Sequence, residues 1–551
     1  MKTAIVENIT KVLSKHSSII TQDDRLQAYR ANCEGFDNQT GCVIKIGCTD
    51  DIRQVLQLAT RCADDVELAF SVCPISTGQN WGYGSGGANA ADSIVLDLSA
   101  LASITINSET LGIVTVQPGV TQQMLYDELL LRQLDFMVPV TGAGPSCSIL
   151  ANALERGYGI TPFTDHFAAV NSIKGYLADG SFYQSPISEL DKSGTDFIDK
   201  TYKYGIGPYI DGLFTQSGFA VVTEITIRLK RRTAAFDSFY VQFRQDEDFE
   251  QAQAVAFKIL QLLDGVVGSV NIMDQRRLLS MMADNPNGRA KHLAMSAAQV
   301  AELSKRYDTP GWMLVGTLYG QPSIVKAARK EIKGFVGSSA KRLIFSGGAL
   351  LRVARAVLYI TPDSWLSGVR AMLKSLDMGI EIMQGKPNQV ALPLAYWRNP
   401  EYKPGTALHP AKDGCGLLWY APLIPMHAAT MRQFINMVRQ ICPRYGIEPM
   451  ITFTSLKYDT VDSTIPIVFN RKDPTAVEQA RQCLDELVST GLGYGWVPYR
   501  LNLRQQRELL NANSAYWQTV QKLKLAIDPK NIINPGRYQP AYFNHEQKKP
   551  L

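Results

Sequence analysis

A glycine-rich stretch, PISTGQNWGYG from Pro74 to Gly84, has the local pattern best suited to ligand binding. Glycine reaches positive φ without strain and lets successive backbone amides point at an anion. A strand that feeds such a loop can therefore cradle a pyrophosphate. The spacing GxGxxG and its strand and helix context are absent, so a Rossmann dinucleotide site is not indicated. Taken alone, such a stretch is more often an ordinary turn.

Together with four other segments, this stretch resembles the vanillyl-alcohol oxidase and para-cresol methylhydroxylase family of flavoproteins over most of the chain. NALERGYGITPFTDH (Asn152–His166) and YGIGPYIDGLFTQSGFAVVTEITIRL (Tyr204–Leu229) resemble the flavin-binding core of that family. VTVQPGVTQQMLYDEL resembles the strand and helix after the pyrophosphate loop, and AIDPKNIINPGRY (Ala526–Tyr538) resembles the terminal segment. The middle of the chain matches only in patches, GKPNQVALPLAYWR and DGCGLLWYAP.

The resemblance implies that FAD is the cofactor and that the glycine-rich loop cradles its pyrophosphate. The expected cofactor-binding residues lie in the glycine-rich loop, the loop before the NALERG run, the core segments and the terminal segment: Pro74, Ile75, Ser76, Thr77, Gly78, Gln79, Asn80, Gly82, Tyr83, Pro139, Gly142, Ser148, Asn152, Glu155, Arg156, Gly157, Thr161, Asp165, His166, Gly218, Val221, Val222 and Arg537.

Two tyrosines and an arginine are the candidate catalytic residues. In the phenol-oxidising members of the family, such a trio binds the phenol oxygen as phenolate. Tyr83 in NWGYG matches the first tyrosine, and Tyr499 with Arg500 in VPYRLNL matches the pair. An arginine that is always charged, with two hydroxyl donors, lowers the pKa of a buried phenol. The implied reaction removes a hydride from the benzylic carbon para to the phenolate, delivers it to flavin N5 and leaves a quinone methide.

The loop before the NALERG run departs from the family pattern. Family oxidases place an aspartate there, near flavin N5, whereas VPVTGAGPSCSIL contains no carboxylate. Asp165 and His166 match the flavin core and are weak candidates for acid or base. The loop itself offers only hydroxyls and a thiol, at Thr141, Ser146, Cys147 and Ser148.

The covalent tether is a second departure. Many family members link the flavin to a His or Tyr of the cap segment around DGCGLLWYAP, but this segment contains no histidine. His409 and His427 flank it, Tyr420 lies inside it, and Cys147 is a candidate for a thiol link. Each of these side chains is more often structural, so we expect dissociable FAD.

Three hypotheses for function stay open. The first is the oxidation of a para-substituted phenol, with O2 or a cytochrome or other redox protein as electron acceptor. The second is a flavin dehydrogenase for a non-phenolic hydroxy acid or biosynthetic intermediate, whose carboxylate or enolate the same arginine would bind. The third is a flavin-binding protein without turnover. The resemblance also makes a homo-oligomer an expectation.

Composition agrees with a globular enzyme. The 551 residues carry a formal net charge of only +5, with no basic run of the kind that binds nucleic acid. No apolar stretch reaches the length of a membrane span, and MKTAIVENITKVLSKHSS lacks the core of a signal peptide. Nine scattered cysteines suggest reduced thiols in the cytoplasm, and no His or Cys spacing indicates a metal site.

The elements that must position these residues predict an α+β fold with two domains. We expect an FAD-binding domain from residues 1–235 plus 495–551, of the vanillyl-alcohol oxidase type, and an α/β cap domain from 236–494. In the first part, a helix from Thr49, strands over 67–75, 93–98 and 113–116, and a helix from Thr121 are expected. In the cap, strands over 236–243, 312–319, 417–423, 450–456 and 465–469 alternate with helices over 249–263, 323–335, 428–441 and 476–488. This pattern predicts one antiparallel sheet with helices on one face.

Overall fold

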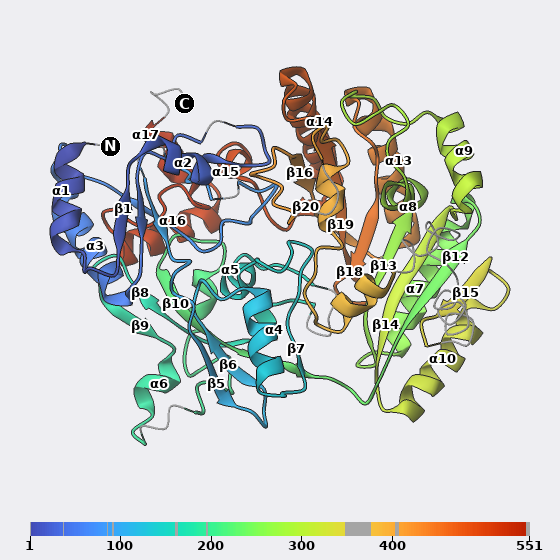
Figure 1. The fold of residues 1–551 in the computed structure, drawn as a ribbon, viewed down its shortest axis with the longest axis horizontal. Helices are drawn as coiled ribbons and strands as arrows, with labels where there is room; N and C mark the ends of the chain where they lie inside the picture. The colour runs from blue at the N-terminus through green and yellow to red at the C-terminus, as the bar shows by residue number, and fades with distance from the viewer. Residues whose placement is uncertain are drawn as a thin grey trace.

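The computed structural model describes residues 2–36, 38–84, 86–90, 93–159, 164–193, 197–347, 376–402 and 407–546. Two bodies of helix and sheet lie side by side along the long axis (Figure 1). Both ends of the chain lie in the same body, and the other contains the green to orange part of the sequence. The fold is α+β, as predicted, and none of the described helices is long and apolar enough to cross a membrane.

The body that holds both termini contains two main sheets. A four-stranded sheet has the order β1-β2-β4-β3, in which β2, β4 and β3 run parallel, and a five-stranded antiparallel sheet has the order β5-β6-β10-β8-β9. The elements are α1 (Thr3–Val12), β1 (Ser18–Ile20), α2 (Asp23–Arg30), β2 (Val43–Lys45), α3 (Thr49–Cys62), β3 (Val72–Ile75), β4 (Ile94–Asp97), β5 (Ile104–Ser108), β6 (Ile113–Val116), α4 (Gln122–Leu131), β7 (Phe136–Met137), α5 (Ile149–Leu154), η1 (Phe167–Ala169), β8 (Val170–Tyr176), β9 (Phe182–Gln184), α6 (Pro186–Leu190), η2 (Asp211–Phe214), β10 (Val221–Arg228) and β11 (Lys230–Arg231).

The C-terminal segment returns to this body through α15 (Leu503–Glu508), α16 (Ala515–Ile527) and α17 (Pro540–Glu546). The Val72 amide donates to Ile532 O at 2.8 Å, and the Asn534 amide donates to Val72 O at 2.7 Å. The return therefore lines the strand that leads into the glycine-rich loop. Buried Lys524 fastens it further, because its Nζ donates to Gly218 O at 2.6 Å and to the Asp528 carboxylate.

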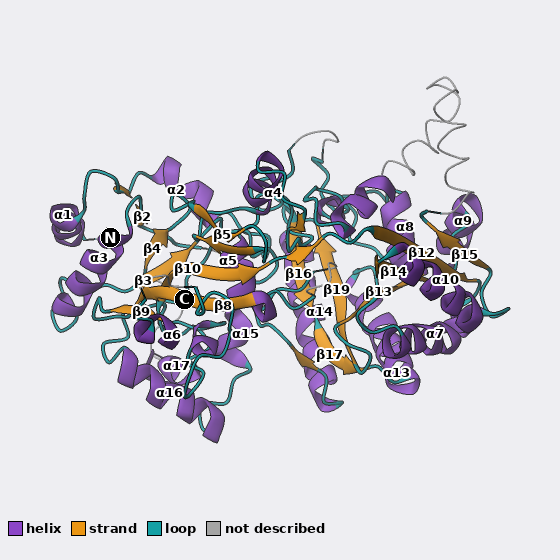
Figure 2. Cartoon of the chain, turned by 90° about the horizontal axis from the view of Figure 1, so that it is seen from below, coloured by secondary structure: helices purple, strands orange, loops and turns teal. Residues whose placement is uncertain are grey.

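The other body is built on an antiparallel sheet of nine strands with the order β15-β12-β14-β13-β18-β19-β17-β20, and β16 also pairs with β19. One large apolar core joins this sheet to α7, α10, α13 and α14, and α7 and α13 lie along one face of it in Figure 2. The elements are β12 (Ala235–Phe243), η3 (Asp246–Asp248), α7 (Phe249–Leu262), β13 (Val267–Asp274), α8 (Gln275–Met282), α9 (Ala297–Tyr307), β14 (Trp312–Gly320), α10 (Pro322–Val336), β15 (Arg342–Phe345), η4 (Leu392–Tyr396), β16 (Gly416–Tyr420), β17 (Pro422–Pro425), α13 (Ala428–Ile441), η5 (Cys442–Tyr445), β18 (Thr452–Ser455), β19 (Thr460–Phe469), α14 (Pro474–Gly493) and β20 (Val497–Pro498).

Three predicted strands were wrong in extent, one of them because β19 begins at Thr460 and not at position 465. The strand expected over 67–75 begins only at Val72, because the preceding residues turn, with the Ala69 amide donating to Asp65 O at 2.7 Å. The strand expected over 417–423 is two strands, β16 and β17, in one continuous register against β19. Pro422 explains the break, because it has no amide to donate to the ladder. We propose the domain division 1–235 with 495–551 around a cap of 236–494, although β20 still pairs with the cap sheet.

Candidate active site

The three predicted catalytic residues meet between the two bodies. The rings of Tyr83 and Tyr499 lie 6.5 Å apart between centroids, edge to face. The Arg500 guanidinium carbon lies 4.9 Å from the centroid of the first ring and 5.3 Å from that of the second. Tyr83 comes from the glycine-rich loop, and the other two follow β20. A cation between two phenol rings, with both hydroxyls nearby, is an arrangement that can hold an anion.

Arg500 is buried and its hydrogen-bond partners are neutral. Nη1 donates to the Asn80 side-chain oxygen at 2.9 Å, and Nη2 donates to the backbone carbonyl of Glu155 at 2.6 Å. Its Nε is buried without a partner among the described residues. Burial lowers the pKa of Arg500, but Tyr499, Glu155 and their neighbours raise it by more, so the group stays charged. Among the described residues, the guanidinium thus has no carboxylate hydrogen-bonded to it, and its Nε donor is unused.

The two tyrosines hold their protons. Burial raises the pKa of Tyr83 and of Tyr499 above the usual range, and the positive charge of Arg500 offsets this only in part. Their hydroxyls therefore act as hydrogen-bond donors at neutral pH rather than as bases.

Two further residues of this site escaped the sequence reasoning. The ring of Tyr158 lies 5.0 Å from that of Tyr499, and burial raises its pKa to about 12. Asp462 on β19 is 7% exposed, and burial raises the pKa of its carboxyl to about 7. Tyr158 could have been found, since it lies within the NALERGYG run. Asp462 precedes the strand expected over 465–469, and only the longer β19 brings it into the sheet.

The glycine-rich loop follows β3 and has the positive φ angles that its sequence predicted. Gly78 has φ +67°, and apart from its chain neighbours no atom of the described residues lies within 4 Å of a Cβ built on it, so open space faces the loop here. Gly82 has φ +82°, but its added Cβ would lie 2.3 Å from the Trp419 indole of β16. Glycine at position 82 is therefore required both by the positive φ and by contact with the cap, and its approach to a pyrophosphate stays a prediction.

A buried carboxyl supports the loop from behind. Glu34 Oε1 accepts the Gly84 amide at 2.8 Å, and its second oxygen is buried without a partner in the described part of the chain. Burial raises the pKa of Glu34 to about 7, although backbone donors counteract the shift. No sequence pattern pointed to Glu34, because it lies 50 positions before Gly84, the residue whose amide it accepts.

Several predicted cofactor residues make polar contacts in pairs, and one of them, Glu155, also bonds to Arg500 through its backbone carbonyl. Arg537 forms an ion pair with Glu155, the C-cap of α5, and the other oxygen of that carboxylate is buried without a partner among the described residues. On the same helix, the Asn152 side chain is 2.5 Å from His166 Nδ1. Burial lowers the pKa of His166 to about 4, so the ring is neutral. Gln79 Nε2 donates to Ser146 Oγ at 2.6 Å, and Gln79 Oε1 is also left without a partner.

Other predicted residues are used within the protein. Arg156 donates to Thr215 Oγ1 from Nε and Nη2, at 3.0 and 2.8 Å, and Asp165 accepts the Phe167 amide at 2.9 Å. Ser148 is the N-cap of α5, where it accepts from Ala151 N and donates to Pro118 O. A role at the cofactor stays a prediction for these three, as it does for the remaining members of the set: Pro74, Ile75, Ser76, Thr77, Pro139, Gly142, Gly157, Gly218, Val221 and Val222. Thr161 lies outside the described residues.

The loop without a carboxylate is held by its own side chains. Thr141 Oγ1 accepts from Gln122 Nε2 at 2.9 Å, and the Thr141 amide donates to the oxygen of the same glutamine at 3.2 Å. Cys147 is buried, and burial raises the pKa of its thiol. These groups are neutral at ordinary pH, so the loop supplies no base.

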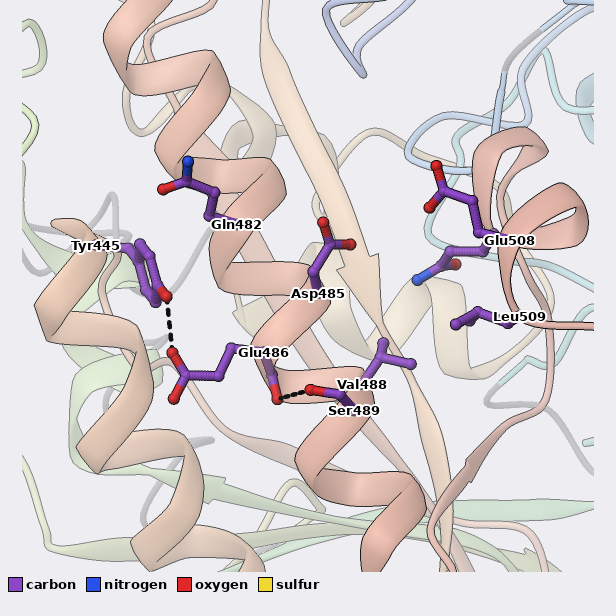
Figure 3. A pocket seen from close by; sticks show the side chains of 9 residues that line it. Tyr445, Gln482, Asp485, Glu486, Val488, Ser489, Glu508 and Leu509 are labelled. Atoms are coloured by element: carbon purple, nitrogen blue, oxygen red, sulfur yellow. Dashed lines mark hydrogen bonds between the residues drawn. The ribbon is translucent and has the colours of Figure 1, made fainter.

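A surface pocket of about 510 Å³ lies elsewhere, between α14 and α15 (Figure 3). It is lined by Tyr445, Gln482, Asp485, Glu486, Val488, Ser489, Gln505, Glu508 and Leu509. Its carboxylates already have partners, since Glu486 pairs with Arg444, and Asp485 and Glu508 both pair with Arg504. None of the lining residues belongs to the tyrosine and arginine site, which is the better candidate on chemical grounds.

Comparison with known proteins identifies the fold family. A family model described as FAD binding domain matches residues 41–184. The chain is 30% identical to 1'-carboxy-chondrochloren decarboxylase of Chondromyces crocatus over 488 residues, which cover 87% of each protein. It is 24% identical to the flavoprotein subunit of 4-cresol dehydrogenase (hydroxylating) of Pseudomonas putida, over 96% of this chain and 94% of that protein. The chain belongs to the vanillyl-alcohol oxidase and para-cresol methylhydroxylase family.

Solved structures of this family share the whole fold. Substrate-bound p-cresol methylhydroxylase superposes with a TM-score of 0.82 at 21% identity, covering 97% of this chain and 96% of that chain. The isoeugenol complex of 4-ethylphenol oxidase from Gulosibacter chungangensis superposes with a TM-score of 0.84 at 18% identity and the same coverage. Membership makes this chain an FAD-dependent enzyme of the oxidoreductase class.

The residues present suit FAD. Open space faces the positive-φ turn at Gly78, and buried polar atoms on the predicted cofactor residues Gln79, Glu155 and His166 and on Arg500 lack partners among the described residues. Buried polar atoms are rarely left unpaired, so these atoms indicate a polar ligand. Loop amides suit the pyrophosphate, and the other groups suit the hydrogen-bonding edges of the flavin.

Proposed function

We propose that this enzyme oxidises a para-substituted phenol at the benzylic carbon. The observation that carries the proposal is Arg500, whose buried charge has only neutral hydrogen-bond partners and is flanked by Tyr83 and Tyr499. A buried cation without an ion-pair partner is costly, and an anionic substrate oxygen would relieve that cost. The p-cresol and 4-ethylphenol enzymes of the family, named for such phenols, support this choice of substrate class.

The chain's own groups have separate tasks in this reaction. Arg500 and the two hydroxyls bind the substrate oxygen and favour phenolate over phenol. A phenolate raises the electron density at the para position, which weakens the benzylic C–H bond toward loss of hydride. Bound FAD supplies the hydride acceptor. Trp419 and Trp81, linked by a hydrogen bond of 3.1 Å from indole to carbonyl, pack the cap against the loop and help to exclude water.

Loss of carbon dioxide is the second candidate outcome. The relative from Chondromyces crocatus is named as a decarboxylase, and its identity with this chain is higher than that of the 4-cresol dehydrogenase subunit. The loop before α5 has no carboxylate to assist water addition, which also favours an outcome other than hydroxylation. A phenolic acid would keep the same phenolate site and lose its carboxylate as the oxidised product forms.

We further propose that FAD is bound without a covalent link. Tyr420 is fully buried in the cap core and stacks on Phe434, and His427 is exposed at the start of α13. His409 packs against Trp81 of the loop, with ring centroids 5.6 Å apart, so this candidate tether contacts the loop directly. Acid precipitation should leave the flavin in the supernatant, and yellow colour in the pellet would overturn the proposal and direct attention to His409 and Cys147.

Anaerobic addition of 4-ethylphenol tests the function. We expect the flavin absorbance to bleach, and product analysis then separates alkene or alcohol formation from release of carbon dioxide by a phenolic acid. Bleaching by hydroxy acids but not by phenols would favour the non-phenolic dehydrogenase. Absence of bleaching with both would support a flavin-binding protein without turnover. Reoxidation by O2 or by a cytochrome, measured after bleaching, identifies the acceptor.

A further inference from the structure

Asp462 is a buried carboxyl with almost no protein partners. It lies on β19, opposite Leu423 of β17 and Thr454 of β18. Thr464 Oγ1 donates to Oδ2 at a long 3.3 Å, and Oδ1 is buried without a partner among the described residues. A structural carboxylate at this depth would normally be paired or multiply hydrogen-bonded. The unused oxygen therefore indicates a group reserved for a ligand or a proton.

The groups that face Asp462 are the residues of the proposed substrate site. Its charge interacts with Tyr83 from the glycine-rich loop, with Tyr158 after α5, and with Tyr499 and Arg500 after β20. Burial raises its pKa to about 7, while Thr464 and Arg500 counteract that rise. The carboxyl can thus change its charge near neutral pH, unlike the tyrosines and the arginine around it.

The charges of the site balance only if Asp462 is counted. Arg537 is neutralised by its ion pair with Glu155, which leaves Arg500 as the cation of the substrate site. Without substrate, ionised Asp462 interacts with Arg500 through space but forms no hydrogen bond or ion pair with it, so the Arg500 donors stay available to a ligand. If phenolate entered beside ionised Asp462, two negative charges would face one cation in a buried site, which is unfavourable.

We propose that Asp462 accepts the proton of the substrate's phenolic hydroxyl, an inference that rests on the proposed oxidation of a phenol. The phenol O–H bond breaks, its proton goes to the free oxygen of the carboxylate, and the negative charge passes from Asp462 to the substrate oxygen beside Arg500. The phenolate then loses its benzylic hydride to the oxidised flavin and becomes a neutral quinone methide. His166 is a poorer acceptor, because its Nδ1 is bonded to Asn152 and its ring resists protonation.

Proton counting with 4-fluorophenol tests the proposal without turnover, because this phenol has no benzylic carbon. Titration calorimetry of the holoenzyme in buffers of different ionisation enthalpy gives the number of protons released on binding, and the ¹⁹F shift reports whether the bound ligand is phenolate. At about pH 8 Asp462 is ionised and takes the proton, so release should be near zero; at about pH 6 it is already neutral, so release should approach one. In Asp462→Asn, release should approach one at both pH values.

Two more variants complete the test. Thr464→Val removes a hydrogen bond to the charged form, so the pH at which proton release changes should move upward, and this variant serves if Asp462→Asn fails to fold. Asp274→Asn is the matched control, a fully buried helix-capping aspartate on another strand of the sheet, and should behave as the parent. Equal proton release at about pH 8 in the parent and in Asp462→Asn, with phenolate bound in both, would overturn the inference alone. Failure of the parent to bind phenolate would overturn the proposed function as well.

Discussion

Arg500, which is buried, and Arg537, which is mostly buried, both contact Glu155, yet their surroundings differ. Arg537 pairs with the Glu155 carboxylate, whereas Arg500 bonds to the backbone carbonyl of the same residue and to Asn80. The charge of the first is neutralised within the protein, and that of the second remains available to a ligand. Arg537 thus belongs to a structural ion pair, and Arg500 belongs to an anion-binding site on the other side of Glu155. Their positions in the sequence do not reveal this difference.

Substitution of Arg537 should have the largest effect on the free energy of unfolding. Arg537→Met leaves the Glu155 carboxylate without its cation; because Glu155 is partly exposed, the loss should fall below the roughly 3 to 5 kcal/mol of a fully buried pair, at about 2 kcal/mol. Chemical denaturation of the holoenzyme measures this loss. Arg500→Met should cost clearly less, because its partners are neutral. Equal losses in the two variants would show that both arginines are structural.

Acid should destabilise the same side. His166 is bonded to Asn152 on the helix that ends at Glu155, and burial lowers its pKa from 6.5 to about 4. Between pH 6.5 and about 4 the unfolded chain binds more protons than the folded chain. The free energy of unfolding therefore has its full value above pH 6.5 and falls by about 3 kcal/mol as the pH drops to about 4. Denaturation measured at several pH values in this range gives the free energy of unfolding as a function of pH. This dependence should be weaker in His166→Gln, and an unchanged dependence would assign the effect to other groups.

The Arg500 side should respond in catalysis. A charge-assisted hydrogen bond is worth roughly 1.5 to 3 kcal/mol, so Arg500→Met should slow flavin reduction by 4-ethylphenol roughly tenfold to a hundredfold. Arg500→Lys keeps the charge but loses the planar fork, so it should recover only part of the rate. Stopped-flow reduction under anaerobic conditions measures both. Rates within about twofold of the parent would place the substrate elsewhere.

Single hydroxyls should have the smallest effects. Tyr499→Phe removes one neutral donor, worth about 1 kcal/mol, and should slow reduction roughly fivefold. Tyr538 is the matched control on the Arg537 side, where its hydroxyl accepts the Leu501 amide at 3.0 Å. Tyr538→Phe should lower stability and leave the reduction rate unchanged. A reversal of these two phenotypes would contradict the assignment of the sites.

The candidate site was predictable from sequence where its residues lie in long matched segments. Tyr83, Tyr499 and Arg500 could be selected through the resemblance, and the structure brings them together. Asp462 could not, because a single carboxylate in a strand becomes meaningful only when pairing with β17 and β18 carries it to the same site. The starts and ends of strands were also poorly predicted, as Val72 and Pro422 show. Hydrogen bonds between strands determine these boundaries, and local hydrophobicity does not reveal them.

The reason for a glycine was equally hidden. Gly78 and Gly82 belong to the same glycine-rich stretch and both have positive φ. Only Gly82 is crowded by Trp419, a residue 337 positions further along the chain. The motif thus predicts the backbone conformation, whereas only the tertiary fold shows which side chain leaves no room for a Cβ at the glycine.

The most direct test of the central claim is the ionisation state of a bound phenol. The holoenzyme is titrated with 4-fluorophenol at a pH about two units below the solution pKa of that phenol, and its ¹⁹F shift is read in the parent, in Arg500→Met and in Arg537→Lys. The account predicts phenolate in the parent and in Arg537→Lys, and neutral phenol in Arg500→Met. Neutral phenol in the parent, or phenolate retained in Arg500→Met, would contradict it.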